Sequence, residues 1–167
     1  MKSLNKLGPS QQISLFKIMS LSWVKRRMLV EIVSLFFVIL FLYTGISKLL
    51  DFDVFKGQLE ESPVLEKVAP MIAWGLPITE FAVSILLFFP KYRLKGLYAT
   101  FALMIGFTLY VIALLATSTE LPCSCGGIIE ELSWPGHLIF NGTLTLLAFT
   151  SIVLQKKIYK EDQNKPF

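Results

Sequence analysis

The chain is poor in the side chains that carry most catalytic and metal-binding chemistry. It has two cysteines and one histidine among 167 residues, and only 17% of its residues are charged. Nearly all of these charges lie outside the long apolar runs, so a soluble globular domain is not the expected structure. The sequence also lacks internal repeats and low-complexity segments, which excludes a repeat array as its architecture.

Apolar residues are what the chain has in excess, at 54% of the sequence. They are concentrated in four windows of 19 to 22 residues, namely Met28–Ile46, Met71–Phe89, Gly96–Thr117 and Gly136–Leu154. A helix of this length, at about 1.5 Å rise per residue, crosses roughly 30 Å of hydrocarbon. The first window is too long for a signal-peptide core and has no cleavage site after it, so we expect it to be retained. We therefore predict an all-α, polytopic membrane protein built as a four-transmembrane-helix bundle.

Basic residues are distributed unevenly between the two sides of the predicted membrane. Thirteen of the sixteen lie in residues 1–27, in the segment 91–95 between the second and third windows, or after residue 155. Loops rich in lysine and arginine stay in the cytoplasm, so this pattern places both termini there. The segment between the third and fourth windows then faces outward. The net charge of +4 is explained by membrane topology, and no nucleic-acid partner is expected.

These boundaries divide the chain into three parts. Residues 1–27 form a basic cytoplasmic tail, residues 28–155 the membrane domain, and residues 156–167 a cytoplasmic C-terminal tail. Within the membrane domain, Pro70 and Pro77 fall near the start of and inside the second window. Because proline lacks an amide donor, we expect that helix to be bent or interrupted.

The outward-facing loops carry further helix signals. Phe52, Phe55 and Leu59 recur at helical spacing and predict a helix lying at the membrane surface. Ser62-Pro63 is typical of a helix start, with a serine cap and proline in the first turn. Ser133-Trp134-Pro135 predicts in the same way the start of the fourth membrane helix.

Cys123 and Cys125 are the only cysteines, separated by one residue in the loop predicted to face outward. Disulfides persist in such an oxidising compartment. A disulfide between them would close a very small, strained ring that exchanges readily and adds little stability. Three interpretations stay open: exchange with a partner thiol, a soft-metal half-site for copper or zinc, and a passive clip. Gly126-Gly127 favours exchange, because it lets another backbone approach the sulfur atoms.

His137 is the only histidine and lies twelve residues after Cys125. It could activate a thiol, move its proton or act as a third metal ligand, or it could simply hydrogen-bond locally. Asn141 follows four residues later, which puts both side chains on one face of the predicted helix.

Glu80 lies near the middle of the second window, where a carboxylate is costly and faces the bundle interior. We expect it to be protonated or to pair with Lys48 or Asn141, and either a helix-packing hydrogen bond or a quinone or proton site is consistent with its position. Glu31, beside Arg27, is expected to form an ordinary ion pair at the membrane surface.

Together these residues resemble a known family. The segment Tyr43–Leu49 and the pattern Pro77-x-x-Glu80 are similar to the DoxX-type four-helix membrane family. Cys123–Gly127, followed by Ser133-Trp134-x-x-His137-x-x-x-Asn141, narrows the resemblance to the methylamine-utilisation (MauE) branch. The resemblance covers roughly residues 30–155.

The resemblance implies a protein of the bacterial cytoplasmic membrane that supports periplasmic thiol–disulfide exchange or disulfide formation. Its partner would be a thioredoxin-like protein or a disulfide-containing substrate protein. Cys123 and Cys125 would cycle between dithiol and disulfide, with His137 tuning the thiol, Asn141 orienting His137 and Glu80 contacting a possible quinone. The alternatives are a copper or zinc site at Cys123, Cys125 and His137, or a non-catalytic scaffold. The chain lacks the second cysteine pair of quinone-coupled disulfide generators, so it cannot relay electrons between two internal pairs.

Overall fold

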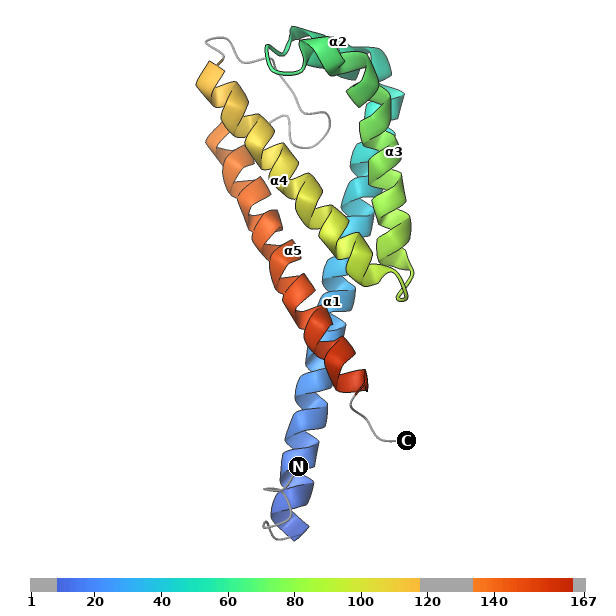
Figure 1. Cartoon of the computed structure of the whole chain (residues 1–167), viewed down its shortest axis with the longest axis vertical. Coiled ribbons are helices and arrows are strands. Elements are labelled where there is room, and N and C mark those ends of the chain that lie inside the picture. Colours follow the sequence, from blue (N-terminus) through green and yellow to red (C-terminus); the bar gives the residue numbers. More distant parts are fainter. Residues whose placement is uncertain (1–8, 118–133, 164–167) are drawn as a thin grey trace.

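The computed structural model describes residues 9–117 and 134–163, and within these ranges the regular elements are all helical (Figure 1). In chain order they are α1 (Pro9–Leu50), α2 (Phe52–Glu61), the short 3-10 helix η2 (Glu66–Val68), α3 (Ala69–Phe88), α4 (Arg93–Thr117) and α5 (Trp134–Gln163). The all-α prediction is confirmed.

Four segments are long and apolar enough to cross a membrane: Trp23–Leu50, Glu66–Phe88, Arg93–Ala116 and Gly136–Gln163. They contain the four predicted windows almost completely. Many large apolar side chains on them are exposed, Ile32 at 65% and Ile139 at 70% among them. Such a surface suits contact with lipid chains rather than water. The chain is a multi-pass membrane protein.

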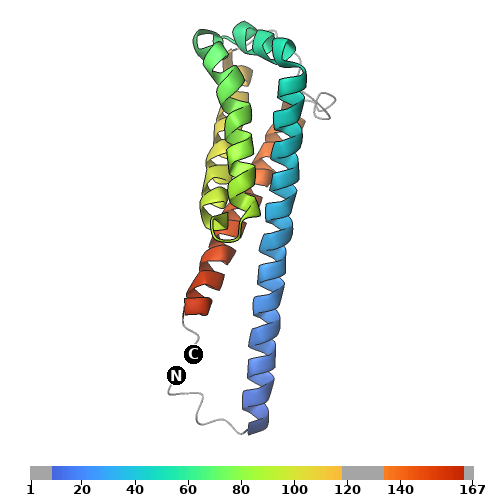
Figure 2. The ribbon, with the colours of Figure 1, turned by 90° about the vertical axis from the view of Figure 1, so that its right-hand side faces the viewer.

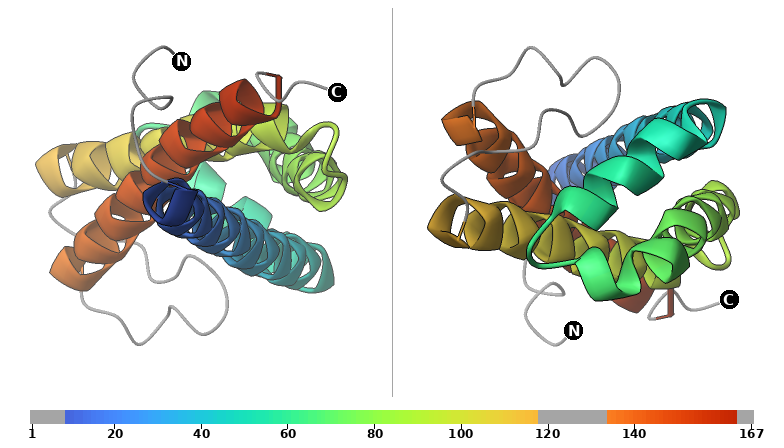
Figure 3. Two further views of the ribbon diagram at one scale, coloured as in Figure 1. Left: turned by 90° about the horizontal axis from the view of Figure 1, so that it is seen from below. Right: turned by 90° about the horizontal axis from the view of Figure 1, so that it is seen from above.

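The four membrane helices form two pairs. α1 packs mainly along α3 and α4 mainly along α5, whereas α1 and α4 make little contact. The two pairs approach each other at one end of the bundle and diverge toward the other end (Figure 1), where α2 connects α1 to α3 (Figure 2). α2 lies across the diverging end, as the view along the bundle shows (Figure 3). We call this the α2 end.

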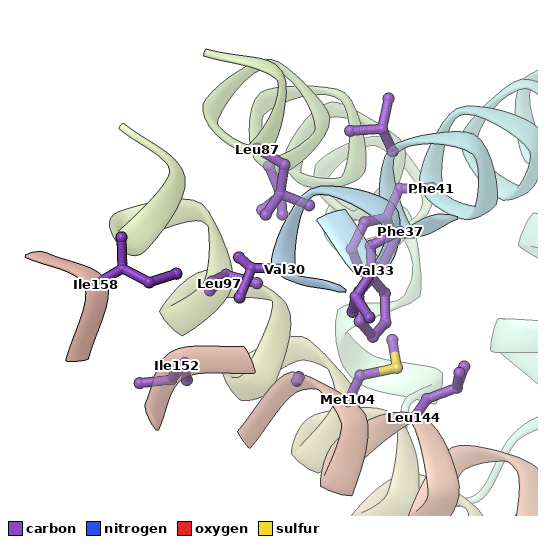
Figure 4. Close-up of a cluster of buried hydrophobic side chains, with 13 residues drawn as sticks. Val30, Val33, Phe37, Phe41, Leu87, Leu97, Met104, Leu144, Ile152 and Ile158 are labelled. Carbon is purple, nitrogen blue, oxygen red and sulfur yellow. The ribbon is translucent and has the colours of Figure 1, made fainter. Parts of the chain in front are cut away.

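The main hydrophobic core joins the two pairs where they converge. Its buried side chains come from all four membrane helices and include Val30, Phe37, Phe41, Leu87, Leu97, Met104, Leu144 and Ile152 (Figure 4). The α3–α4 connection is especially tight, because a Cβ atom at Gly96 would lie 2.8 Å from the backbone nitrogen of Leu87. Only glycine lets the first turn of α4 come this close to α3.

The opposite end of the bundle, the basic end, gathers the three basic segments. Arg26 of α1 pairs with Glu161 of α5 at 3.0 Å. Glu31 lies 3.7 Å from Arg27, the predicted pair, and also 3.5 Å from Arg93 at the start of α4. These contacts confirm that residues near both ends of the chain and the α3–α4 connection share one side of the bundle.

Two helix predictions are wrong in detail. α3 continues without a break from Ala69 to Phe88 although it contains the buried Pro77, so the predicted interruption is wrong, while the alternative of a bend stays a prediction. Membrane helices tolerate such a proline because neighbouring groups satisfy the freed carbonyl. Ser62 ends α2, with its amide donating to the carbonyl of Leu59 at 3.3 Å, and does not cap a new helix. The predicted helix at Phe52, Phe55 and Leu59 and the start of α5 at Trp134 are confirmed.

Candidate functional site: a cavity between the helix pairs

A partly enclosed cavity of about 300 Å³ lies between the helix pairs at the α2 end. Every α-helix contributes to its wall, and most of its lining side chains are apolar. The main core closes it toward the basic end, because Phe41, Met104 and Leu144 belong to both. Its polar lining includes Thr44, Lys48, Glu80, Tyr110, His137 and Asn141. A mostly apolar cavity with a few polar groups is the usual form of a small-molecule site.

An ion pair joins α1 to α3 in the cavity wall. The ammonium of Lys48 donates to Glu80 Oε1 at 2.8 Å, and the hydroxyl of Thr44 donates to the same oxygen at 3.1 Å. The Glu80 side chain is 1% exposed and that of Lys48 is 12% exposed. Of the two predicted partners of Glu80, Lys48 is therefore the one that binds it.

The α1 sequence explains how this pair forms. Thr44 and Lys48 are one helical turn apart, so both reach the same carboxylate of α3. Gly45 lies between them, and a Cβ atom there would be 3.3 Å from Glu80 Oε2 and 3.2 Å from the ring of Phe81. The absence of a side chain at Gly45 lets α3 bring its carboxylate against α1.

The second carboxylate oxygen of Glu80 differs from the first in its hydrogen bonding. Glu80 Oε2 is buried and accepts no hydrogen bond from the residues that the structure describes. Buried polar atoms are almost always paired, so an orphaned one calls for an explanation. A bound ligand, a proton or a water molecule on this oxygen would each provide such an explanation.

His137 and Asn141 bring α5 to the same cavity. They lie one turn apart and both line it, so the predicted common face is confirmed. His137 is only 7% exposed. The backbone carbonyl of Asn141 accepts the Thr145 hydroxyl at 2.7 Å, while its side-chain amide has no partner in the described part of the chain.

A contact that sequence reasoning missed secures α2 over the cavity. The Tyr110 hydroxyl of α4 donates to the hydroxyl of Ser62, which is fully buried at the end of α2, at 3.3 Å. On the other side of α2, Phe52 lies against Trp74 of α3 with ring centroids 4.6 Å apart. The one available signal for this contact was the position of Tyr110, a polar-tipped aromatic residue well inside the third apolar window.

The two cysteines lie outside the described residues. The helices that flank them in sequence, α4 ending at Thr117 and α5 beginning at Trp134, have those ends at the α2 end of the bundle (Figure 1). Within residues 9–117 and 134–163, no group of three histidine, cysteine, aspartate or glutamate residues could hold a metal ion. The predicted metal set of Cys123, Cys125 and His137 has two members beyond those ranges.

Comparison with known proteins adds one finding. The model of the family described as methylamine utilisation protein MauE matches residues 26–154. No curated protein and no solved structure matches the chain. The matched region extends through all four membrane helices and includes every residue of the cavity wall. The chain therefore belongs to the MauE family.

Proposed function

We propose that this protein is the membrane component of a thiol–disulfide exchange system outside the cytoplasm, and that it supports disulfide formation in a partner protein. The observation that carries the proposal is the position of the cavity. Its buried Lys48–Glu80 pair and His137 lie at the same end of the bundle as the two helix ends that flank the cysteine segment. Membership of a methylamine-utilisation family supplies a bacterial context for such a partner.

The proposed orientation has both termini in the cytoplasm and Cys123 and Cys125 facing the periplasm across the bacterial inner membrane. Its support is the gathering of basic segments at one end of the bundle, linked by the Arg26–Glu161 pair. We also propose a relationship to the DoxX-type proteins. Its support is the joining of the Thr44 and Lys48 segment to Glu80.

The proposed reaction is a balanced exchange. A thiolate of the partner attacks the Cys123–Cys125 disulfide and forms a mixed disulfide, and the partner's second thiolate then displaces the cysteine of this chain. The partner gains one disulfide, and this chain receives two electrons and becomes a dithiol. His137 would give and take the proton of the thiol, with Asn141 orienting it one turn away. A periplasmic thioredoxin-like protein or a disulfide-containing substrate protein fits the partner's role.

The test is to leave one thiol without its neighbour. In the single variants Cys123→Ser and Cys125→Ser, the remaining thiolate can attack the disulfide of an oxidised partner, but this chain has no second thiol to release the mixed disulfide. At least one of them should accumulate a covalent adduct with another protein that runs as a larger band on a non-reducing gel and disappears with dithiothreitol. Mass spectrometry of that band identifies the partner.

Ser124→Ala is the matched control, because it changes the residue between the cysteines and leaves both sulfur atoms. It should behave like the wild type, and the double cysteine variant should show no adduct. Absence of an adduct from both single variants, together with normal disulfide formation in cells carrying the double variant, would contradict the proposed function.

A further inference from the structure

We propose that the cavity at the α2 end binds the headgroup of a lipid-soluble quinone, the electron acceptor that reoxidises the cysteine pair. The choice of a redox-active ligand rests on the proposed function. The existence of a ligand site rests on the cavity alone. A chain with a single cysteine pair must pass its electrons to another molecule after each turnover, and a membrane-embedded cavity gives access to an acceptor dissolved in the bilayer.

The charge of the cavity wall selects an uncharged ligand. Among the described residues, Lys48 and Glu80 are the only lysine, arginine, aspartate or glutamate side chains in the lining, and they neutralise each other at 2.8 Å. Most of the remaining lining is aliphatic or aromatic. A ligand with a net charge would lose its hydration here without a free counter-charge, which is unfavourable.

The free hydrogen-bonding groups select a ligand with carbonyl oxygens. The Lys48 ammonium has three N–H donors, of which one binds Glu80 Oε1 and one binds the Thr44 carbonyl at 3.3 Å. No described residue accepts from the third, and the ammonium lies 5.8 Å from the ring centroid of Phe55 in the same cavity wall. On α5, the Asn141 amide has no hydrogen-bond partner among the described residues. A quinone ring has a carbonyl acceptor on each of two opposite sides, which matches donors on two different helices.

The size and surface of the cavity fit a single flat ring. A volume of about 300 Å³ is at the lower end for small-molecule sites. Phe55, Phe107 and Phe140 contribute aromatic side chains to the wall, suited to packing against a ring. The cavity lies among helices that cross the membrane, so an isoprenoid tail can remain in the apolar surroundings.

The electrons and protons of the proposed step balance. Oxidation of the Cys123 and Cys125 dithiol to a disulfide releases two electrons and two protons, and a quinone takes up both to become a hydroquinone. Glu80 Oε2, buried and without a hydrogen bond from the described residues, can hold a proton beside the ring. Lys48 and Asn141 would bind the carbonyl oxygens on which negative charge develops.

The test measures binding of decylubiquinone to the purified full-length protein in lipid nanodiscs. We expect saturable binding, weakened about tenfold by Asn141→Leu, since one hydrogen bond to a buried group is lost. Lys48→Met should weaken binding at least as much. Because Asn141→Leu removes no side-chain hydrogen bond to a described residue, it remains informative if Lys48→Met fails to fold. Thr143→Val is the matched control, since Thr143 lies on the exposed face of α5.

A tail-only probe, decylbenzene, separates recognition of the ring from partition into the bilayer. Equal binding of both probes, or equal affinity of the wild type and Asn141→Leu for the quinone, would overturn the proposal. The variant with both cysteines changed to serine should still bind decylubiquinone but should not reduce it. Adducts with a partner in the absence of quinone binding would overturn the quinone site and leave the exchange function standing. Quinone binding without any adduct would overturn the exchange function and leave the quinone site standing.

Discussion

The two ends of the bundle each hold ion pairs between helices, but in very different surroundings. At the basic end, the Arg26 and Glu161 side chains are 27% and 42% exposed. At the α2 end, Lys48 and Glu80 are 12% and 1% exposed. An exposed pair contributes about 0–1 kcal/mol, whereas burying two charges carries a desolvation cost that their attraction often fails to offset.

This contrast supports the proposal that the α2 end carries the function and the basic end has a structural role. The pairs at the basic end are consistent with charges that remain in the cytoplasm and with weak links between helix ends. Burying Lys48 and Glu80 at the α2 end costs desolvation free energy, which apolar residues in the same positions would avoid. The pair also lines a cavity in which Glu80 Oε2 and the Asn141 amide have no hydrogen-bond partner among the described residues. These features support the proposal that the chemistry of this protein takes place at the α2 end.

The largest expected difference between the two ends is their accessibility from outside the cell. In a chain with both native cysteines changed to serine, a new cysteine is introduced either at Glu61, exposed at the end of α2, or at Lys91, exposed between α3 and α4. A membrane-impermeant maleimide applied to spheroplasts should label Glu61→Cys and leave Lys91→Cys unlabelled until the membrane is opened. The reverse pattern would invert the proposed topology.

The next largest effect concerns the buried pair. Lys48→Met should destabilise the fold by about 3–5 kcal/mol, because it leaves the Glu80 carboxylate buried without its counter-charge. Lys48→Met combined with Glu80→Leu should recover most of that loss. Chemical unfolding in detergent micelles, followed by circular dichroism, measures both. A double variant no more stable than the single one would show that the uncompensated charge is not the cause.

A smaller effect is expected at the tight α3–α4 connection. Gly96→Ala should destabilise by about 1–3 kcal/mol, because the added methyl group meets the backbone of Leu86 and Leu87 within 3.0 Å. At Gly142 of α5 nothing lies within 4 Å of the new Cβ atom. Gly142→Ala should therefore stabilise by up to about 1 kcal/mol through helix propensity. Equal effects of the two substitutions on thermal unfolding would contradict the close approach at Gly96.

The smallest effect is expected for the exposed pair at the basic end. Glu161→Gln should cost less than about 1 kcal/mol, because both side chains are partly solvated and screened. The difference from wild type should shrink further as salt is added. A loss of stability as large as that of Lys48→Met would contradict the claim that ion pairs at the two ends differ in their energetic weight.

Local patterns in the sequence were enough to predict much of the fold. Hydrophobic windows located the four membrane helices, and the spacing of Phe52, Phe55 and Leu59 located α2. The cost of an intramembrane carboxylate pointed to an interior partner for Glu80, and helical periodicity placed His137 and Asn141 on one face.

Contacts set by the packing of helices could not be predicted in the same way. The Tyr110–Ser62 hydrogen bond and the Arg93–Glu31 pair depend on how distant helices cross, which periodicity within one helix does not specify. The cavity is a product of the divergence of two helix pairs, so no single segment encodes it. Pro77 was misjudged because its local propensity opposes a helix that the surrounding bundle maintains.

The most direct test of the account is the redox state of Cys123 and Cys125 in living cells, measured by the mass shift on alkylating free thiols after acid quenching. We predict a steady-state mixture of dithiol and disulfide that becomes fully reduced with dithiothreitol and returns to the mixture after wash-out. His137→Ala should slow that recovery. Thiols that stay reduced throughout, or that react only after a chelator is added, would contradict thiol–disulfide exchange as the work of this protein.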